Sequence, residues 1–138
     1  MILKSKRYIR KLPYYNWLVR MRGFLEDELE EFPSIGQCYV SAKLVEHELN
    51  LPVYSGILET VAKKRVFHYC NFDDEREIFV DLSIDMFSMI FDPISAHSPN
   101  DRYFSIAGAD DRIYPSELRR AEELIQLYET EVSVLYVQ

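Results

Sequence analysis

Hydrophobic residues recur at three- and four-residue steps in the stretch that begins at Tyr14. The apolar positions of this stripe are Tyr14, Trp17, Leu18, Met21, Leu25 and Leu29. Charged residues fill the positions between them, namely Arg20, Arg22, Glu26, Asp27, Glu28 and Glu30. A period of about 3.6 residues predicts an amphipathic helix whose charged face is solvated. Pro33 and the following Ser-Ile-Gly predict its end and a short connection.

A second helical pattern begins near Cys38 and runs to about Leu49. Its stripe carries mostly small or apolar side chains, namely Cys38, Ser41, Ala42, Val45 and Leu49. The small side chains in the first turn allow a neighbouring sheet to approach the helix closely. Asn50 and Pro52 are typical of the residues that follow a helix end.

Residues rich in β-branched and aromatic side chains predict three strands, at 53–61, 66–72 and 77–82. Gly56 indicates a possible bulge in the first strand. A four-residue turn at 73–76 would pair Phe72 with Glu77, and the same register places His68 opposite Asp81. We therefore expect an α+β fold, in which an antiparallel sheet packs against the helix that carries Cys38 at its N-terminus.

The last third of the chain has a weaker pattern. Residues 85–91 predict a short helix or turn, and residues 92–111 resemble a loop without an assigned element. Ser116 is a typical N-cap with Glu117 in the first turn. A helical stripe follows, made of Leu118, Ala121, Leu124, Ile125 and Tyr128. Residues 132–137 are β-branched enough to form a strand instead of continuing this helix.

The length of 138 residues fits a single domain, and a hydrophobic content of 48% is enough for a core. We divide it into a basic arm and helix at 1–33, a core at 34–91, and a loop and C-terminal helix at 92–138. No apolar run is long enough to span a bilayer, and the first residues lack a secretory signal. We expect a cytoplasmic protein with no membrane partner, in which Cys38 and Cys70 are reduced thiols rather than a disulfide.

The net charge of −7 is unevenly distributed. Residues 1–22 contain seven Lys or Arg and no acidic residue, which leaves nine positive residues against all 23 acidic ones in the remainder. The basic arm either binds an anionic partner or lies across the acidic remainder of its own domain. The overall acidity argues against general nucleic-acid binding, so we expect no nucleic-acid partner.

Three residues combine into a candidate catalytic site. Cys38 lies at a helix N-terminus, where unpaired backbone N–H groups and the helix dipole favour the reactive thiolate. His68 lies in the middle of a strand and can take up and return the thiol proton. Asp81 ends the partner strand, where a carboxylate in apolar surroundings needs a partner. Together they have the roles of nucleophile, base and orienting acid.

The motifs around these residues resemble those of a known superfamily. Gly36-Gln37-Cys38-Tyr39 is similar to the Gly-Gln-Cys-Trp nucleophile motif of transglutaminases. His68-Tyr69-Cys70-Asn71 resembles their His-x-Trp-Asn motif, and Phe79-Val80-Asp81-Leu82 resembles the motif of their downstream Asp. The combination looks most like the bacterial YunG-like proteins, in which the third motif is Asp-Leu-Thr-x-Asp-Gln-Phe. Here residues 81–87 have the sequence Asp-Leu-Ser-Ile-Asp-Met-Phe, and the resemblance covers about residues 34–91.

This resemblance implies a papain-like or transglutaminase-like core in which Cys38, His68 and Asp81 are catalytic. It implies no particular substrate. As a first hypothesis we expect Cys38 to attack an amide or peptide carbonyl of a protein, peptide or small amide, with hydrolysis or acyl transfer as the outcome. We expect no cofactor and no metal. Substrate or oxyanion contacts are expected from residues next to the triad, namely Gln37, Tyr39, Cys70 and Asn71. Cys70 departs from the pattern, because it replaces the tryptophan beside the histidine.

Other interpretations use the same residues. The chain is alternatively an inactive binding module that retains the fold without the chemistry. A metal site would combine His68 and Cys70 with Cys38 or Asp81, although no paired ligand motif accompanies them. His47, on a charged helix face, and His97, in a loop, receive no role. Trp17 is expected in the core, with an N–H that could reach a site.

Overall fold

A computed structural model describes residues 9–29, 32, 37–59, 65–83, 95–97, 104–105 and 115–133. These residues form a mixed α+β fold with the element order α2, α3, β1, β2, β3, β4, β5, α4 and η2. The expected short helix at 85–91, and the part of the expected terminal strand beyond residue 133, lie outside the described residues.

The first predicted helix is confirmed as α2 (Tyr15–Glu28). Its buried apolar residues are those of the expected stripe, namely Leu18, Met21 and Leu25. The prediction that its charged residues are all solvated is wrong for Arg22, which is only 5% exposed. Arg22 lies four residues after Leu18 and three before Leu25, so it occupies the buried stripe itself.

The second helix, α3 (Gln37–Leu49), is buried on nearly every side. Its buried residues extend well beyond the expected stripe and include Gln37, Tyr39, Val40 and Leu44. A helix buried all round must lie between other layers of the fold. The helix ends as predicted at Asn50, whose φ of 58° is left-handed and whose N–H donates to the Glu46 carbonyl at 3.0 Å.

The predicted strands belong to a five-stranded antiparallel sheet with the order β4-β3-β2-β1-β5. The strands are β1 (Val53–Glu59), β2 (Arg65–Asp73), β3 (Ile78–Asp81), β4 (Ser95–His97) and β5 (Phe104–Ser105). The two edge strands lie in the region that we expected to be a loop, and His97 therefore lies in a strand that pairs with Phe79. The expected bulge at Gly56 is also wrong, because β1 and β2 pair without interruption and Gly56 lies opposite His68.

The register of the β2–β3 hairpin differs from the predicted one by two residues. The turn comprises residues 74–77, Phe72 pairs with Phe79, and Asp73 pairs with Ile78. Asp81 is therefore not directly opposite His68, as we predicted, but lies diagonally across from it. A shift of two residues keeps every side chain on its original face of the sheet, because side chains alternate with a period of two. The two residues thus still share a face.

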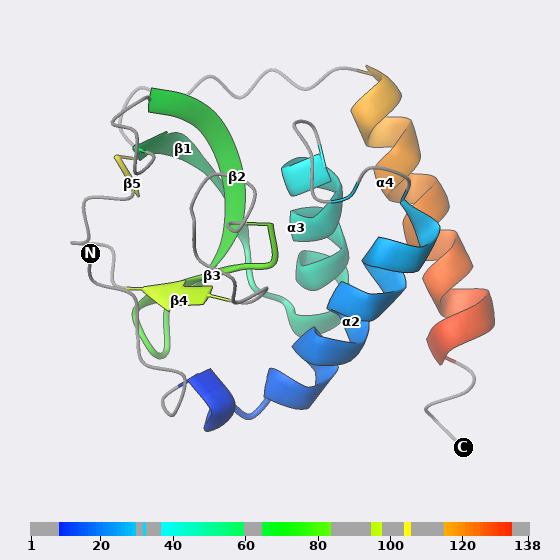
Figure 1. The fold of residues 1–138 in the computed structure, drawn as a ribbon, viewed down its shortest axis with the longest axis horizontal. Helices are drawn as coiled ribbons and strands as arrows, with labels where there is room; N and C mark the ends of the chain where they lie inside the picture. The colour runs from blue at the N-terminus through cyan, green and yellow to red at the C-terminus, as the bar shows by residue number, and fades with distance from the viewer. Residues whose placement is uncertain are drawn as a thin grey trace.

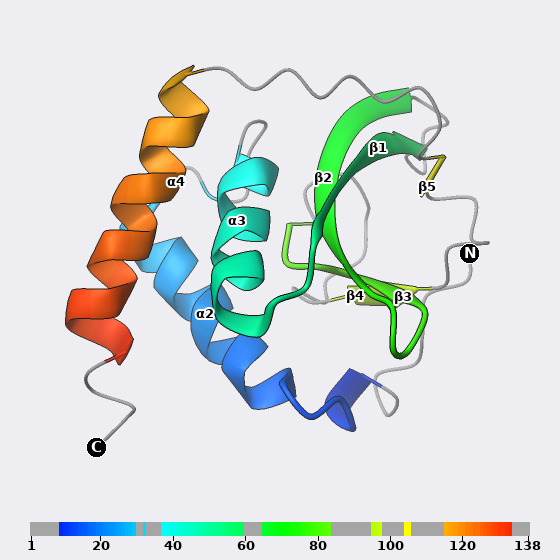
Figure 2. The ribbon, with the colours of Figure 1, turned by 180° about the vertical axis from the view of Figure 1, so that it is seen from behind.

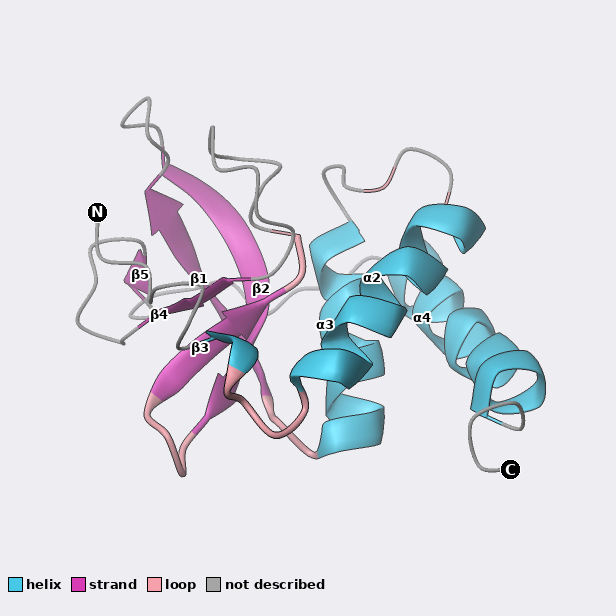
Figure 3. Cartoon of the chain, turned by 60° about the horizontal axis from the view of Figure 1, so that its bottom comes forward, coloured by secondary structure: helices cyan, strands magenta, loops and turns pink. Residues whose placement is uncertain are grey.

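The fold is layered, with α3 between the sheet and the outer helices (Figures 1 and 2). Asn71 joins the sheet to α3, because its amide donates to the carbonyls of Ala42 at 2.9 Å and Leu51 at 3.0 Å. Figure 3 shows the sheet on one side of the molecule and helices α2, α3 and α4 together on the other. The core between them comes from all layers and includes Leu18, Met21, Val40, Leu44, Ile78, Val80 and Leu124.

The C-terminal helix is confirmed as α4 (Pro115–Leu127), followed by the π-helix η2 (Tyr128–Ser133). The helix begins one residue before the expected N-cap, so Ser116 is inside it, and a proline suits its first position. Leu118 is 44% exposed and does not belong to the buried stripe. Residues 132 and 133 are helical rather than extended. Within the described ranges, no helix has the length and apolar character needed to cross a membrane.

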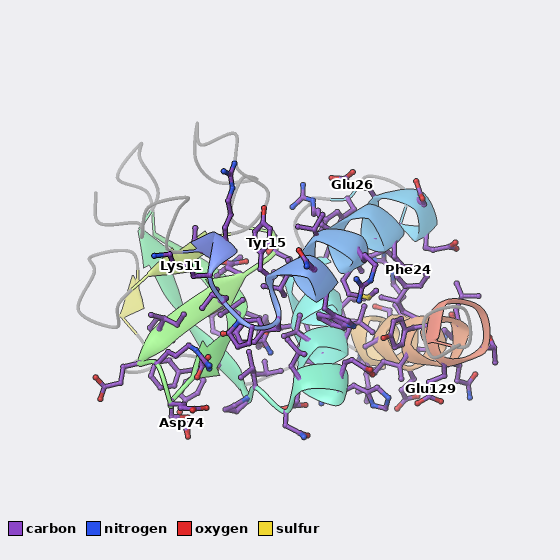
Figure 4. All side chains as sticks on the ribbon, turned by 90° about the horizontal axis from the view of Figure 1, so that it is seen from below. Lys11, Tyr15, Phe24, Glu26, Asp74 and Glu129 are labelled. Atoms are coloured by element: carbon purple, nitrogen blue, oxygen red, sulfur yellow. The ribbon has the colours of Figure 1, made fainter. Side chains whose placement is uncertain are left out.

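An aromatic cluster joins the two ends of the chain. The indole N–H of Trp17 donates to the Tyr128 hydroxyl at 3.0 Å, so it does not point to the candidate site. The Trp17 and Phe24 rings both meet the Tyr128 ring edge to face, at 6.3 and 6.1 Å between centroids. Phe24 lies between α2 and the C-terminal helix in Figure 4. This cluster holds the start of η2, which continues α4, against α2.

We predict that Asn71→Ala lowers the free energy of unfolding by about 2–4 kcal/mol, because two carbonyls lose their buried donor. Asn16→Ala makes the same change at an exposed position of α2 and should cost less than about 0.5 kcal/mol. Urea unfolding of both variants measures the difference. Equal effects of the two substitutions would contradict the role of Asn71 in joining the sheet to α3.

Candidate active site

The centre of the candidate site is a buried pair between His68 on β2 and Asp81 at the end of β3. The His68 Nε2 and Asp81 Oδ2 atoms are 2.6 Å apart, and the two residues are 0% and 2% exposed. Diagonal neighbours on adjacent strands are within reach of each other's longer side chains. The structure therefore brings these two predicted residues together despite the shifted register.

The second oxygen of Asp81 is also bonded. Asp81 Oδ1 accepts hydrogen bonds from the backbone N–H of Ser83 at 2.9 Å and from its hydroxyl at 3.1 Å. Ser83 itself is fully buried. Because both carboxylate oxygens are held, the orientation of Asp81 is fixed and that of the imidazole follows from it.

Cys38 lies in the first turn of α3, beside the strand that carries His68. Asn71 is bonded to the Ala42 carbonyl, and the Tyr39 and Tyr69 rings meet at 5.2 Å between centroids. Cys38 is four residues before Ala42, about 6 Å along a helix, and Tyr69 is two residues before Asn71, about 7 Å along a strand. Cys38 is therefore level with Tyr69, which is the neighbour of His68 in the chain, and it packs with Tyr69 in one cluster.

The surroundings of His68 favour its protonated form. Burial opposes the positive charge, but the charge and hydrogen bond of Asp81 and the neighbouring Cys38 thiol outweigh it. Together they raise the pKa of His68 from 6.5 to about 10. The interaction with Cys38 connects the third predicted residue to the pair.

Cys70 lies on the same face of β2 as His68 and is 2% exposed. Extending the β2–β3 register by one residue places it opposite Asp81. Burial, together with the negative charges of Asp81 and Cys38, raises the pKa of the Cys70 thiol well above its ordinary value. We therefore expect the Cys70 thiol to stay protonated and to line the site rather than act as a second nucleophile.

The other residues predicted near the substrate are all buried. Tyr39 is 4% exposed and packs on Tyr69, and burial raises the pKa of its hydroxyl. Asn71 uses its amide N–H groups to join β2 to α3 and the following loop. Gln37 is 3% exposed, and its buried Oε1 has no hydrogen-bond partner among the residues that the structure describes. Contact of these residues with a substrate stays a prediction.

Two residues of the site region were missed in the sequence. Gly56 pairs with His68, so β1 presents no side chain directly beside the imidazole. Arg22 donates from Nη1 to the carbonyl of Leu82, the residue between Asp81 and Ser83. The helical period contained the signal for Arg22, because its position falls on the apolar stripe. Gly56 gave no signal, because its role depends on the strand register.

The remaining histidines and the metal interpretation gain no support from the geometry. His47 is exposed, as expected, and its Nε2 is 2.7 Å from Glu129 Oε1. His97 lies in β4, on the far side of β3 from β2. Among the residues that the structure describes, no group of three or more His, Cys, Asp and Glu side chains is arranged to hold a metal ion.

Comparisons with known proteins add no relative. No protein-family model matches the chain, and neither a curated protein nor a solved structure matches it. The likeness to transglutaminase-like proteins therefore rests on the motifs around Cys38, His68 and Asp81 alone.

We predict that the stability of the protein falls between pH 6.5 and pH 8.5 because of His68. The folded protein retains a proton on His68 that the unfolded chain releases above about pH 6.5. This stabilisation is complete below pH 6.5 and is lost as the pH rises towards 10, with a slope of at most about 1.4 kcal/mol per pH unit. Urea unfolding at a series of pH values measures the slope.

The control is His68→Gln, which keeps the other titrating groups and should lack this slope. The buried Asp81 then loses its partner, so we also expect a loss of about 3–5 kcal/mol at pH 6.5. Parallel pH profiles for the wild type and the variant between pH 6.5 and pH 8.5 would contradict the protonated buried pair.

We predict that Gly56→Val destabilises the protein by about 1–3 kcal/mol, because its side chain would occupy the space beside the His68 ring. Gly23→Val is the matched control, since a Cβ atom at Gly23 meets nothing within 4 Å. That substitution should change stability by less than about 0.5 kcal/mol. Thermal unfolding of the two variants compares them, and an unaltered melting temperature for Gly56→Val would show that the position is not crowded.

Proposed function

We propose that this protein is a thiol-dependent hydrolase or acyltransferase that acts on an amide or peptide carbonyl. In this proposal Cys38 is the nucleophile, His68 the base and Asp81 the orienting acid. The observation that carries the proposal is the buried His68–Asp81 pair, 2.6 Å between Nε2 and Oδ2, beside the cysteine at the N-terminus of α3. An ion pair buried in this way requires compensation for its desolvation, and a role in proton transfer supplies a reason to retain it.

The first chemical step forms a thioester. Asp81 is bonded to Nε2 of His68, so Nδ1 is the ring nitrogen that holds the proton given up by the Cys38 thiol, and the resting pair is a thiolate and an imidazolium. The Cys38 sulfur then attacks the substrate carbonyl and gives a tetrahedral oxyanion. His68 returns the proton to the leaving amine, the C–N bond breaks, and the acyl group remains on Cys38.

The N-terminal turn of α3 supports stabilisation of the oxyanion. Backbone N–H groups in the first turn of a helix have no partner within the helix, and the Cys38 N–H is the donor nearest to the reacting carbon. The neighbouring Gln37 is buried in the same turn, and we propose that its side-chain amide contacts the substrate. A buried carboxamide contributes donors and an acceptor without adding charge.

The second step transfers the acyl group from Cys38. Water or an amine loses a proton to His68 and attacks the thioester, and His68 then returns that proton to the departing Cys38 sulfur. We take hydrolysis as the default, with transfer to an amine as the other outcome. The motifs and the mixed α+β fold also support a papain-like or transglutaminase-like core.

One observation favours an alternative, in which the chain is an inactive binding module with the same fold. Cys38, His68 and Asp81 are 5%, 0% and 2% exposed, whereas a substrate carbonyl must reach the sulfur. In the alternative, the His68–Asp81 pair serves stability alone and Cys38 is an ordinary buried thiol. The same experiment separates the two functions.

We predict that iodoacetamide alkylates Cys38 rapidly below pH 8 and that His68→Ala slows this reaction at least tenfold. A thiolate–imidazolium pair supplies the reactive sulfur at a pH where a free thiol is mostly protonated. Mass spectrometry of the labelled peptide separates Cys38 from Cys70, which serves as an internal control because its raised pKa keeps it unreactive. A profile like that of free cysteine in both proteins would support the inactive module.

A further inference from the structure

We propose that Arg22 is a positioning residue for the candidate site, which holds the Asp81–Ser83 segment so that Asp81 faces His68. This inference rests on the proposed function, because that function makes the site a catalytic one, but its test does not require catalytic activity. It assigns a role in the site to a helix that carries none of the three predicted catalytic residues.

Arg22 reaches the segment through its guanidinium group. Its Nη1 donates to the carbonyl of Leu82. Leu82 lies between Asp81 and Ser83, which are joined by the hydrogen bond from the Ser83 N–H to Asp81 Oδ1. The Nε of Arg22 donates to Glu26 Oε1 at 2.7 Å, one turn further along α2. Glu26 lies on the outer side of α2 in Figure 4. The guanidinium group therefore spans from the surface of α2 to the backbone next to Asp81.

The burial of Arg22 makes this arrangement specific. An arginine that is 5% exposed has given up most of its hydration, so its N–H groups require partners of fixed geometry. A backbone carbonyl is such a partner, and it moves only if the chain around it moves. Breaking the contact would remove a charged donor from the buried carbonyl of Leu82, which is costly, so the segment is held firmly.

Arg22 also contacts the connection that precedes Cys38. The guanidinium carbon lies 4.7 Å from the centre of the Phe32 ring, at cation–π distance. Phe32 is on the path from α2 to α3, five residues before the start of α3. One side chain thus contacts both the segment of Asp81 and the approach to the nucleophile helix.

The test uses the proton on His68 as its readout. Among the described residues, the titratable groups that raise the pKa of His68 are Asp81 from β3 and Cys38 from α3, and the opposite residue of β1 is Gly56, which has no side chain. If Asp81 is held less firmly, its stabilisation of the imidazolium weakens. NMR titration of histidine ring resonances follows His68 directly, with His68→Gln used to assign its signal.

We predict that Arg22→Met lowers the His68 titration midpoint by at least one pH unit, a tenfold change in its protonation equilibrium. Arg22→Lys retains one charged donor and should lower the midpoint less, so it replaces the methionine variant if that variant does not fold. A midpoint within 0.3 units of the wild type in the folded variant would overturn the positioning role. A wild-type His68 that titrates at its ordinary value would overturn it too, because no pair would then need holding.

Two controls separate positioning from general loss of stability. Leu124→Ala removes core volume on α4, which lies across α3 from the sheet, and should destabilise by about 2–5 kcal/mol while leaving the His68 midpoint unchanged. Arg20→Met removes an exposed arginine of the same helix and should leave the midpoint unchanged. An equal shift in either control would overturn the specific role of Arg22.

Failure of the proposed function gives a different result. An unreactive Cys38 alters the alkylation profile of the wild type but not the effect of Arg22→Met on the His68 titration. Conversely, Cys38 could react rapidly while Arg22→Met leaves the titration midpoint of His68 unchanged. That result would agree with the proposed enzyme function and would contradict the positioning role of Arg22.

Discussion

The site depends on one buried ion pair, between the imidazole of His68 and the carboxylate of Asp81. Removing both groups from water is costly, and their attraction compensates only when geometry and further hydrogen bonds are favourable. The structure provides these through Ser83, which binds the other carboxylate oxygen, and through Arg22, which binds the intervening backbone. The buried carboxylate of Asp81 is thus held both by Ser83, just after β3, and by Arg22 of α2, through the backbone of Leu82.

The layers around this pair explain how Cys38 comes to it. The amide of Asn71 connects β2 to α3, and the contact of Tyr39 with Tyr69 aligns the first turn of α3 along the same strand. The helix begins at the level of Tyr69, the neighbour of His68, so its first turn brings Cys38 close to the imidazole. Packing of the core and assembly of the candidate site are therefore the same set of contacts.

Much of this could be predicted because it depends on local pattern. The helical stripes of α2, α3 and α4 and the hairpin of β2 and β3 follow from hydrophobic period and turn residues. The turn at 74–77 shows the limit, because the sequence Asp-Asp-Glu-Arg allows the loop to begin at Asp73 or at Asp74. The prediction that His68 and Asp81 lie on the same face of the sheet is nevertheless confirmed, because an error of two residues in the register does not exchange the faces.

What could not be predicted depends on contacts between distant residues. Strands β4 and β5 are three and two residues long, too short to give a periodic signal, and they are defined by pairing with β3 and β1. Arg22 was assigned to the solvated face because arginine is usually exposed, whereas its partner is 60 residues away. Gly56 was interpreted as a possible bulge because a glycine within a strand pattern is typical of one, whereas its place opposite His68 is set by the register of β1 and β2.

The hydrogen bond between Trp17 and Tyr128 has a consequence for the order in which the protein is built. The two residues are 111 positions apart, and α3 packs against α4, which follows the described strands in the sequence. During synthesis on the ribosome, α3 lacks part of its surroundings until α4 has emerged. A nascent chain that stops before α4 would leave the buried side of α3 open to water, so the environment of Cys38 is complete only after α4 has been synthesised.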